Sequence, residues 1–388
     1  MSKMNHPIEK MPEPLRGEVV SSVILKAVPT EEPSNFSITE RISASQALAK
    51  WRRSLPQRGS IDARGNGRQL LNCTHKMEGG GCVSESFPNT EAGNPTFSLW
   101  LELVEVCNLD CLFCYNPWRP HGNTQAPLLS TNQLLDVIST LFSRLDIAYV
   151  TLAGGEPLMR QDLIQIIEHL RSWSAPVGMA TNGRSATRNL LQRYRSAGLA
   201  QIAVPIHSHE PAVHDRLTGA KSWHSAVRAL AIAQELGYFA TMSTVITRLN
   251  SQHIGRLCEI VDLLGLDHYV LNCFHPVGQG SLNTDTLVPF RLEFDQALGE
   301  ARDHLGSRAI VDVGSPPVSS TIGLNQINRV VLSPTGDLKF CVQSNRGAVN
   351  LVTNDHESID QVLALLGSGN HQELINSVDN CTCRGDSY

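Results

Sequence analysis

The chain has 388 residues, of which 41% are hydrophobic and 18% charged, and its formal net charge is −5. This composition is that of a globular protein, and the lack of a basic surplus argues against a general nucleic-acid binder. The sequence contains no apolar run of about eighteen residues and no N-terminal secretory signal, so we expect a cytoplasmic protein that does not bind a membrane. In the reducing cytoplasm, ten cysteines indicate metal ligation or catalysis more than disulfides.

Residues 1–93 are rich in Pro, Ser, Asn and Gly and carry only short apolar stretches, which predicts a poorly structured N-terminal extension. One short helix is expected within it, over residues 43–53. Cys73 and Cys82 flank a glycine-rich loop that also contains His75. This group could hold a metal, but a flexible loop with two free thiols is the favoured interpretation.

From Thr96 onwards the pattern changes to regular elements. Alternating Phe97, Leu99, Leu101 and Leu103 predict a strand that faces a core. Ser130 with Gln133 predicts a capping box at the start of a helix. The apolar face of this helix is expected to carry Leu134, Leu135, Ile138, Leu141 and Phe142. Five more strands are predicted over residues 148–152, 177–180, 201–206, 240–245 and 268–271, and further helices over residues 163–173, 186–197, 222–236 and 251–264.

Strands that alternate with helices imply a parallel sheet with right-handed crossovers. The periodicity fits a barrel-like sheet and a doubly wound sheet equally, and in both the chemistry belongs at the carboxyl ends of the strands. The expected core covers residues 94–288, and a C-terminal region covers residues 289–388. In the latter we predict an amphipathic helix at 294–305, a hairpin at 330–340 that turns at 334–336, a last helix and a cysteine-bearing tail.

Cys107, Cys111 and Cys114 follow the first predicted strand on a single loop. Iron–sulfur clusters favour thiolate ligands and usually take four of them, so three close thiolates would leave one iron open to a non-protein ligand. A structural zinc site would need a fourth ligand, which His121 could supply. The spacing favours the cluster over zinc.

The CxxxCxxC spacing after a first strand, with Phe113 before the third cysteine, resembles the signature of the radical S-adenosylmethionine (SAM) superfamily. Two further motifs of that family have counterparts in the same order: Gly154-Gly155-Glu156-Pro157 resembles GGEP, and Thr181-Asn182-Gly183 resembles TNG. Residues 214–219 and 244–250 are similar to elements of the subgroup with C-terminal SPASM or twitch domains. The resemblance implies an α/β fold, a partial (β/α)6 TIM-like barrel with a C-terminal α+β extension of the auxiliary-cluster type.

In that family the open iron chelates the amino and carboxylate groups of SAM, and reduction of the cluster releases a 5′-deoxyadenosyl radical. The resemblance therefore implies a [4Fe–4S] cluster on the three cysteines, SAM, and an electron donor such as flavodoxin or ferredoxin. Glu156 would accept a hydrogen bond from the amino group of SAM, and Gly154 and Gly155 would allow a close backbone approach. The other implied SAM contacts are Phe113, whose flanking backbone would pack against the adenine, and Pro157, Asn182, Ser208 and Arg216.

His207 and His209 replace the acidic Asp-Gly that often ends strand four in related enzymes. They could orient a substrate or shuttle a proton. A structural histidine with satisfied hydrogen bonds is the favoured interpretation of each.

Near the C-terminus, residues 336–341 resemble the GxxxxC element of SPASM and twitch domains, and Cys381 and Cys383 could add two more ligands with Cys341. The match departs from the pattern, since residues 321–328 contain no cysteine and the closing pair is CxC. Three interpretations stay open: a three-cysteine auxiliary cluster with an open iron, a cluster completed by Cys273, or a degenerate domain whose thiols bind zinc or nothing. Cys273 could instead donate a hydrogen atom. Cys258 is expected in the core.

Two hypotheses of different classes follow. The first is a radical SAM oxidoreductase that abstracts hydrogen from a peptide or a small natural-product substrate, with oxidation, crosslinking or epimerisation as the outcome. The second is a non-catalytic iron–sulfur or zinc-binding scaffold with the same fold. The Gly-Gly-Glu-Pro motif counts against the scaffold, since a scaffold has no need of an acceptor for the amino group of SAM.

Overall fold

A computed structural model describes residues 96–121, 127–266, 268–305, 310–313, 329–340 and 349–367. The predicted extension over residues 1–93, with Cys73, His75 and Cys82, lies outside the described residues. So do the three tail cysteines Cys341, Cys381 and Cys383. Within the described part, the structure has no helix of the length and apolarity that a membrane span requires.

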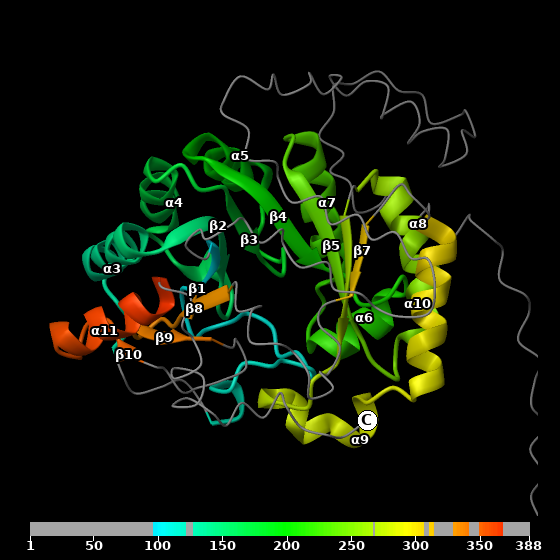
Figure 1. Ribbon diagram of the computed structural model, residues 1–388. Helices are drawn as coiled ribbons and strands as arrows, with labels where there is room; N and C mark the ends of the chain where they lie inside the picture. The colour runs from blue at the N-terminus through cyan, green and yellow to red at the C-terminus, as the bar shows by residue number, and fades with distance from the viewer. Residues whose placement is uncertain are drawn as a thin grey trace, which may run out of the picture. The chain divides into compact units, whose positions relative to one another are not determined.

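The centre of the fold is a sheet whose first seven strands run parallel and lie side by side in chain order (Figure 1). These strands are β1 (Thr96–Glu102), β2 (Asp146–Ala153), β3 (Val177–Ala180), β4 (Leu199–Pro205), β5 (Phe239–Ile246), β6 (His268–Cys273) and β7 (Ile310–Val313). A doubly wound sheet would reverse its strand order at a switch point. Because the order of these strands has no such reversal, the sheet is an open, barrel-like α/β sheet and not a doubly wound one. The sheet is not closed, since β7 and β10 form its two edges.

Helices connect the parallel strands and form an arc along one side of the sheet, in which successive helices pack on each other (Figure 1). They are α3 (Thr131–Arg144), α4 (Leu163–Ser172), α5 (Arg188–Ala197), α7 (Trp223–Glu235), α8 (Ile254–Leu264) and α10 (Arg291–Leu305). Two shorter helices, α6 (Pro211–Thr218) and α9 (Thr284–Leu287), and four 3-10 turns follow strand ends or precede helices. The turns are η1 (Arg119–His121), η2 (Pro157–Met159), η3 (Ser251–His253) and η4 (Gly278–Asn283). Helix α6 was not predicted from the sequence.

The capping box predicted at the start of α3 is confirmed. The Ser130 side chain accepts from the Gln133 backbone N–H, and the Gln133 side chain accepts from the Ser130 backbone N–H at 3.1 Å. The buried face differs from the prediction, because Val137 is buried while Leu135 and Phe142 are half-buried. Phe142 instead stacks on Trp173 with ring centroids 5.3 Å apart, which covers the contact of α3 with α4.

The C-terminal region continues the same sheet. Strand β8 (Arg329–Leu332) pairs parallel to β1 on the side away from β2. Strand β9 (Asp337–Lys339) pairs antiparallel to β8, which confirms the predicted hairpin, and Gly336 takes a positive φ of 96° in its turn. Strand β10 (Val349–Asn350) and helix α11 (His356–Gly367) complete the described chain.

The two faces of the sheet differ in polarity. On β1, Phe97, Leu99 and Leu101 are buried on one face, which is the apolar face that helices cover. The half-buried Trp100 and the carboxylate of Glu102 belong to the opposite, inner face. The inner face of the open barrel thus carries polar groups up to the point where β1 ends and the cysteine loop begins.

Candidate functional site

The three cysteines of the triplet lie on a loop directly after the carboxyl end of β1, as predicted. All three are free thiols and half-buried. The loop turns tightly, since the Cys114 backbone N–H donates to the Cys111 carbonyl at 3.2 Å. Because parallel strands end at one edge, the loops after β2, β3, β4 and β6 lie at the same edge.

The loop after β2 is built against the backbone that leads to Cys107. The Gly155 N–H donates to the Val104 carbonyl, and the Glu156 N–H donates to the Val106 carbonyl, both at 2.8 Å. A Cβ on Gly155 would lie 2.0 Å from the Val106 oxygen, and Gly154 has a positive φ of 121°. In this structure, the two glycines therefore permit a close approach between two protein backbones, the GGEP loop and the start of the cysteine loop.

Glu156 is 1% exposed and joins the loop after β2 to the loop after β3. Its Oε1 accepts from Thr181 Oγ1 at 2.6 Å and from the Leu158 backbone N–H at 3.1 Å. Its Oε2 accepts from the Asn182 backbone N–H at 2.8 Å. Burial raises the pKa of this carboxyl, and the three hydrogen bonds oppose that shift. Pro157, the next residue, is buried at the start of η2.

Asn182 connects the loop after β3 to the first cysteine. Its Nδ2 donates to the Asn108 side-chain oxygen at 2.7 Å and lies 3.7 Å from Cys107 Sγ. Its own oxygen accepts from the Arg184 backbone N–H at 2.9 Å. The GGEP and TNG motifs, which were recognised separately in the sequence, therefore form one hydrogen-bonded frame around Cys107.

Helix α6 holds the middle of the cysteine loop. The Asp110 N–H donates to the Thr218 carbonyl at 3.1 Å, and the Leu112 N–H donates to the Leu217 carbonyl at 2.9 Å. Gly219 follows with a φ of 70°, and a Cβ there would lie 2.4 Å from the Asp110 oxygen. The HDRLTG stretch thus supplies the carbonyls and the glycine that receive this loop.

The segment after β6 holds the end of the loop. The Gly280 N–H donates to the Cys114 carbonyl at 3.2 Å, and Asn283 Nδ2 donates to the Leu112 carbonyl at 3.1 Å. On the other side, Asn116 Nδ2 donates to the Gly154 carbonyl at 3.1 Å. The backbone around the three thiols is therefore fixed from β2, α6 and β6 at once.

Arg119 is a site residue that sequence reasoning missed. Its positive charge opposes the rise that burial gives to the pKa of each of the three thiols. Burial raises these pKa values more strongly, and for Cys111 the neighbouring Cys114 and Cys107 add to the rise. Arg119 Nη2 also lies 3.5 Å from Asp110 Oδ1. No motif marks this arginine, because its position depends on how the loop folds back.

Phe113 lies inside the site and packs on a histidine. Its ring centroid is 4.4 Å from that of His207, which is fully buried after β4. His207 Nδ1 accepts from the Val245 N–H at 3.3 Å, and the His207 N–H donates to His214 Nδ1 at 3.1 Å. Burial lowers the pKa of His207 well below its usual value. His207 is therefore a neutral, hydrogen-bonded structural histidine, in agreement with the favoured interpretation.

Three other predicted site residues lie in different surroundings. The buried Ser208 hydroxyl is engaged by protein, 2.9 Å from His253 Nδ1 and accepting from the Glu210 N–H at 2.9 Å. Arg216 is exposed on α6. Cys273 shares the buried side of β6 with Tyr269 and Leu271, whereas Asn272 is half-buried on the other side. By strand alternation, Asn272 and not Cys273 has the inward position at the end of β6.

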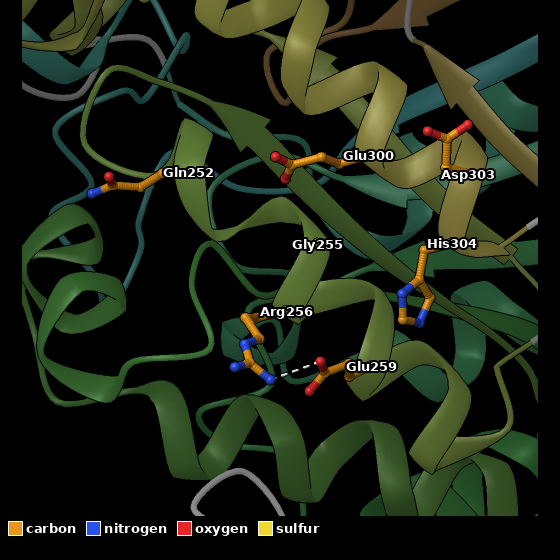
Figure 2. Close-up of a pocket in the computed structure, with 7 residues that line it drawn as sticks. All are labelled: Gln252, Gly255, Arg256, Glu259, Glu300, Asp303 and His304. Atoms are coloured by element: carbon orange, nitrogen blue, oxygen red, sulfur yellow. Dashed lines mark hydrogen bonds and ion pairs between the residues drawn. The ribbon is translucent and has the colours of Figure 1, made fainter. Parts of the chain in front are cut away.

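A shallow hollow of about 550 Å³ lies between α8 and α10 and is separate from the cysteine loop (Figure 2). Its lining is mostly charged and consists of Gln252, Gly255, Arg256, Glu259, Glu300, Asp303 and His304. None of these residues belongs to the predicted site.

The donor set at the cysteine loop suits a cluster better than a single ion. Among the residues that the structure describes, the three thiols do not converge on one point as the ligands of a single zinc would. Soft thiolates on a fixed loop can instead each bind a different iron of one cluster. The side chain of His121, the alternative fourth zinc ligand, lies outside what is described. Cys107, Cys111 and Cys114 would hold the cluster, and when bound it supplies the electron that cleaves SAM.

An open parallel barrel with three cysteines after β1, framed by the GGEP and TNG loops, defines the radical SAM class. The sequence profile of the radical SAM superfamily matches residues 101–262. The chain therefore contains a radical SAM domain, as the motifs predicted. This family uses a [4Fe–4S] cluster and SAM.

Several sequence relatives of the chain are named as probable GTP 3′,8-cyclases. A probable GTP 3′,8-cyclase of Saccharolobus islandicus is 27% identical over 274 residues, 67% of this chain and 87% of that protein. A probable GTP 3′,8-cyclase of Sulfolobus acidocaldarius is 29% identical over 263 residues, 64% of this chain and 82% of that protein. A peptide or natural-product substrate finds no support among these relatives.

Solved structures share the fold. SuiB of Streptococcus suis bound to S-adenosylmethionine has a TM-score of 0.55 at 12% identity and covers 70% of this chain. The match spans 65% of the SuiB chain, slightly less than two thirds. The structure of anSMEcpe with bound AdoMet has a TM-score of 0.53 at 12% identity, over 74% of this chain and 84% of that one. The partial barrel expected from the resemblance is thereby confirmed. The SPASM or twitch assignment of the C-terminal region stays a prediction.

Proposed function

We propose that the protein cleaves SAM reductively at a [4Fe–4S] cluster on Cys107, Cys111 and Cys114, and that the resulting 5′-deoxyadenosyl radical abstracts hydrogen from a small-molecule substrate. The observation that carries this proposal is the frame that joins Cys107, Asn182, Thr181 and Glu156. A chain that only stored a cluster would need the cysteines but not this connection between three strand ends.

In this proposal the chain's own residues bind and orient. Backbone carbonyls of the loop after β2 would receive the amino group of SAM. The Glu156 carboxylate, which is buried and held by three hydrogen bonds from the protein, would position that loop and not accept from SAM as the resemblance implied. Asn182 would keep the Cys107 thiolate in place. Phe113, packed on His207, would form an apolar wall that excludes water near the reacting carbon.

The test is anaerobic reconstitution with iron and sulfide, reduction, and measurement of 5′-deoxyadenosine from SAM. We expect product from the wild type and none from Cys111→Ala. Cys258→Ala is the matched control, because Cys258 is buried in α8 and outside the cysteine loop. Equal product from Cys111→Ala and the wild type would refute the proposal.

For the substrate, a purine nucleotide is the first candidate because the sequence relatives are named as probable GTP 3′,8-cyclases. One feature of the inner barrel face supports a polar substrate. Trp100 lies on β1, and its buried indole N–H has no hydrogen-bond partner among the described residues. An indole N–H is a donor only, so it would suit an acceptor such as a purine ring nitrogen or carbonyl oxygen.

This part is tested by adding GTP to the reduced enzyme and SAM, with ATP as the matched control. We expect GTP, but not ATP, to speed SAM cleavage, and to be converted to a new product detected by mass spectrometry. No effect of GTP on either readout would exclude GTP and return the peptide or natural-product substrate to first place. The measurement of 5′-deoxyadenosine without substrate keeps the two parts of the proposal separate.

A further inference from the structure

Three side chains beyond the end of β4 form a cluster that the proposed radical chemistry does not use. His209 and Glu210 lie in the turn between β4 and α6, and His253 ends η3 just before α8. The Nδ1 atoms of the two histidines are 3.1 Å apart, with ring centroids at 4.8 Å. One ligand atom from each of the three residues lies within 4.8 Å of the others.

Two polar atoms lie within hydrogen-bond distance of His253 Nδ1. This nitrogen lies 3.1 Å from His209 Nδ1 and 2.9 Å from the Ser208 hydroxyl oxygen. A ring nitrogen offers one proton or one lone pair, so it cannot serve both partners with good geometry. A tetrahedral zinc ion with nitrogens at about 2.0–2.1 Å would place two such nitrogens about 3.3 Å apart. The observed separation is close to that value.

The surrounding charges suit a divalent cation. His253 is buried and His209 is half-buried, and a neutral imidazole has a lone pair to offer to a metal. Glu210 Oε1 lies 3.7 Å from His209 Nε2 and contributes a negative charge. The nearby cation, Arg256, is neutralised by Glu259, with Nη1 and Oε1 2.8 Å apart (Figure 2).

We propose that His209, His253 and Glu210 form a zinc-type divalent metal site, separate from the three cysteines. Imidazole and carboxylate ligands suit zinc, and three protein ligands leave the fourth position to water or to the Ser208 hydroxyl. The ion would tie the turn before α6 to the start of α8. Since α6 holds the cysteine loop through the carbonyls of Leu217 and Thr218, the site would stiffen that support. The proposal does not depend on SAM cleavage.

The experiment is zinc titration of the full-length, iron-reconstituted protein, with metal analysis and X-ray absorption at the zinc edge. We expect one zinc per chain with a nitrogen and oxygen shell at about 2.0–2.1 Å and no sulfur at about 2.3 Å. Affinity should fall more than about 100-fold in His209→Ala and in His253→Ala, because even outer partners of a metal ligand are worth about 10- to 100-fold. His304→Ala, which removes a histidine of α10, is the matched control and should bind zinc normally.

Glu210→Gln tests the site in a variant that should fold normally, because Glu210 is exposed and both histidine rings remain in place. It should weaken zinc binding about 10-fold or more while iron content and thermal stability without zinc stay unchanged. Zinc binding that survives in both histidine variants, a sulfur shell, or no zinc above background would overturn the proposal. The last result would identify the cluster as a hydrogen-bonded histidine pair.

Discussion

Glu156 Oε1 accepts a hydrogen bond from Thr181 Oγ1 at 2.6 Å, and this buried contact joins the loop after β2 to the loop after β3. The same hydroxyl accepts from the Gly183 N–H at 3.1 Å. The Thr181 side chain thus connects the GGEP and TNG motifs next to Cys107.

Thr181→Val removes this hydroxyl with little change of shape. It leaves a buried carboxylate oxygen with one donor fewer and the Gly183 N–H without its acceptor, at a cost of about 1–3 kcal/mol for each group. Urea denaturation should show a clear loss of unfolding free energy. Thr140→Val, on the exposed side of α3, should change it by less than about 0.5 kcal/mol. Similar small effects of both variants would contradict the structural importance of the Glu156 contact.

Gly155→Ala should damage the cysteine loop. A Cβ at 2.0 Å from the Val106 oxygen forces two backbones apart, with a cost of about 1–3 kcal/mol or more. We expect reduced stability and a lower iron content after reconstitution. Gly299→Ala in α10 is the control, since its Cβ meets nothing within 4 Å and alanine favours a helix by up to about 1 kcal/mol. Full iron loading of Gly155→Ala would show that the loop yields more easily than the contacts imply.

Lys339 and Glu102 form a buried ion pair of 2.7 Å that ties β9 to the end of β1. Lys339→Met leaves the Glu102 carboxylate buried without its partner and should cost about 3–5 kcal/mol. Glu102→Leu added to Lys339→Met should restore most of this loss, because no unpaired charge then remains. The exposed pair Arg291–Asp295 is the comparison, and its removal should cost less than about 1 kcal/mol. Denaturation of the single and double variants measures the coupling directly.

The unfolding free energy should depend on pH in a way that reflects the lowered pKa of the buried His214. Burial lowers its pKa from 6.5 to about 4. Between these values the unfolded chain binds the proton and the folded chain does not. The unfolding free energy is therefore not reduced by His214 above pH 6.5, and it falls as the pH is lowered towards about 4.

His214→Gln should therefore reduce the loss of unfolding free energy between about pH 7.5 and about pH 5 by about 2 kcal/mol. His356→Gln, at an exposed position of α11, should leave the pH dependence as it is. The same pH dependence in His214→Gln and the wild type would show that His214 is not the group responsible.

Arg119→Leu should make the proposed cluster harder to reduce. Removing a positive charge that acts on all three thiols disfavours the added electron, so the reduction potential of the reconstituted protein should become more negative. Arg119→Lys should retain most of the wild-type value. Arg144→Leu, which removes an exposed arginine paired with Asp360, is the control. Potentiometric titration followed by electron paramagnetic resonance provides the measurement, and an unchanged potential in Arg119→Leu would place the charge too far from the cluster.

The sequence predicted most local elements because these depend on neighbouring residues. The capping box of Ser130 and Gln133 and the turn at Gly336 are short-range patterns, and both are present in the structure. Helix α6 was missed, since its eight residues carry a weak apolar pattern and Leu217 is held by its contact with the cysteine loop.

The sequence by itself determined the class of chemistry, because three cysteines at a fixed spacing on one loop and two ordered motifs are properties of the chain. Only the tertiary structure decided what those motifs contact: the glycines meet the Val104 and Val106 backbone, and Glu156 bridges to Thr181. It also brought Arg119 back to Asp110 of the cysteine loop and His253 beside His209. These relations join residues far apart in the chain or across a folded loop. They arise from the packing of strand ends at one edge of the sheet, which no local pattern encodes.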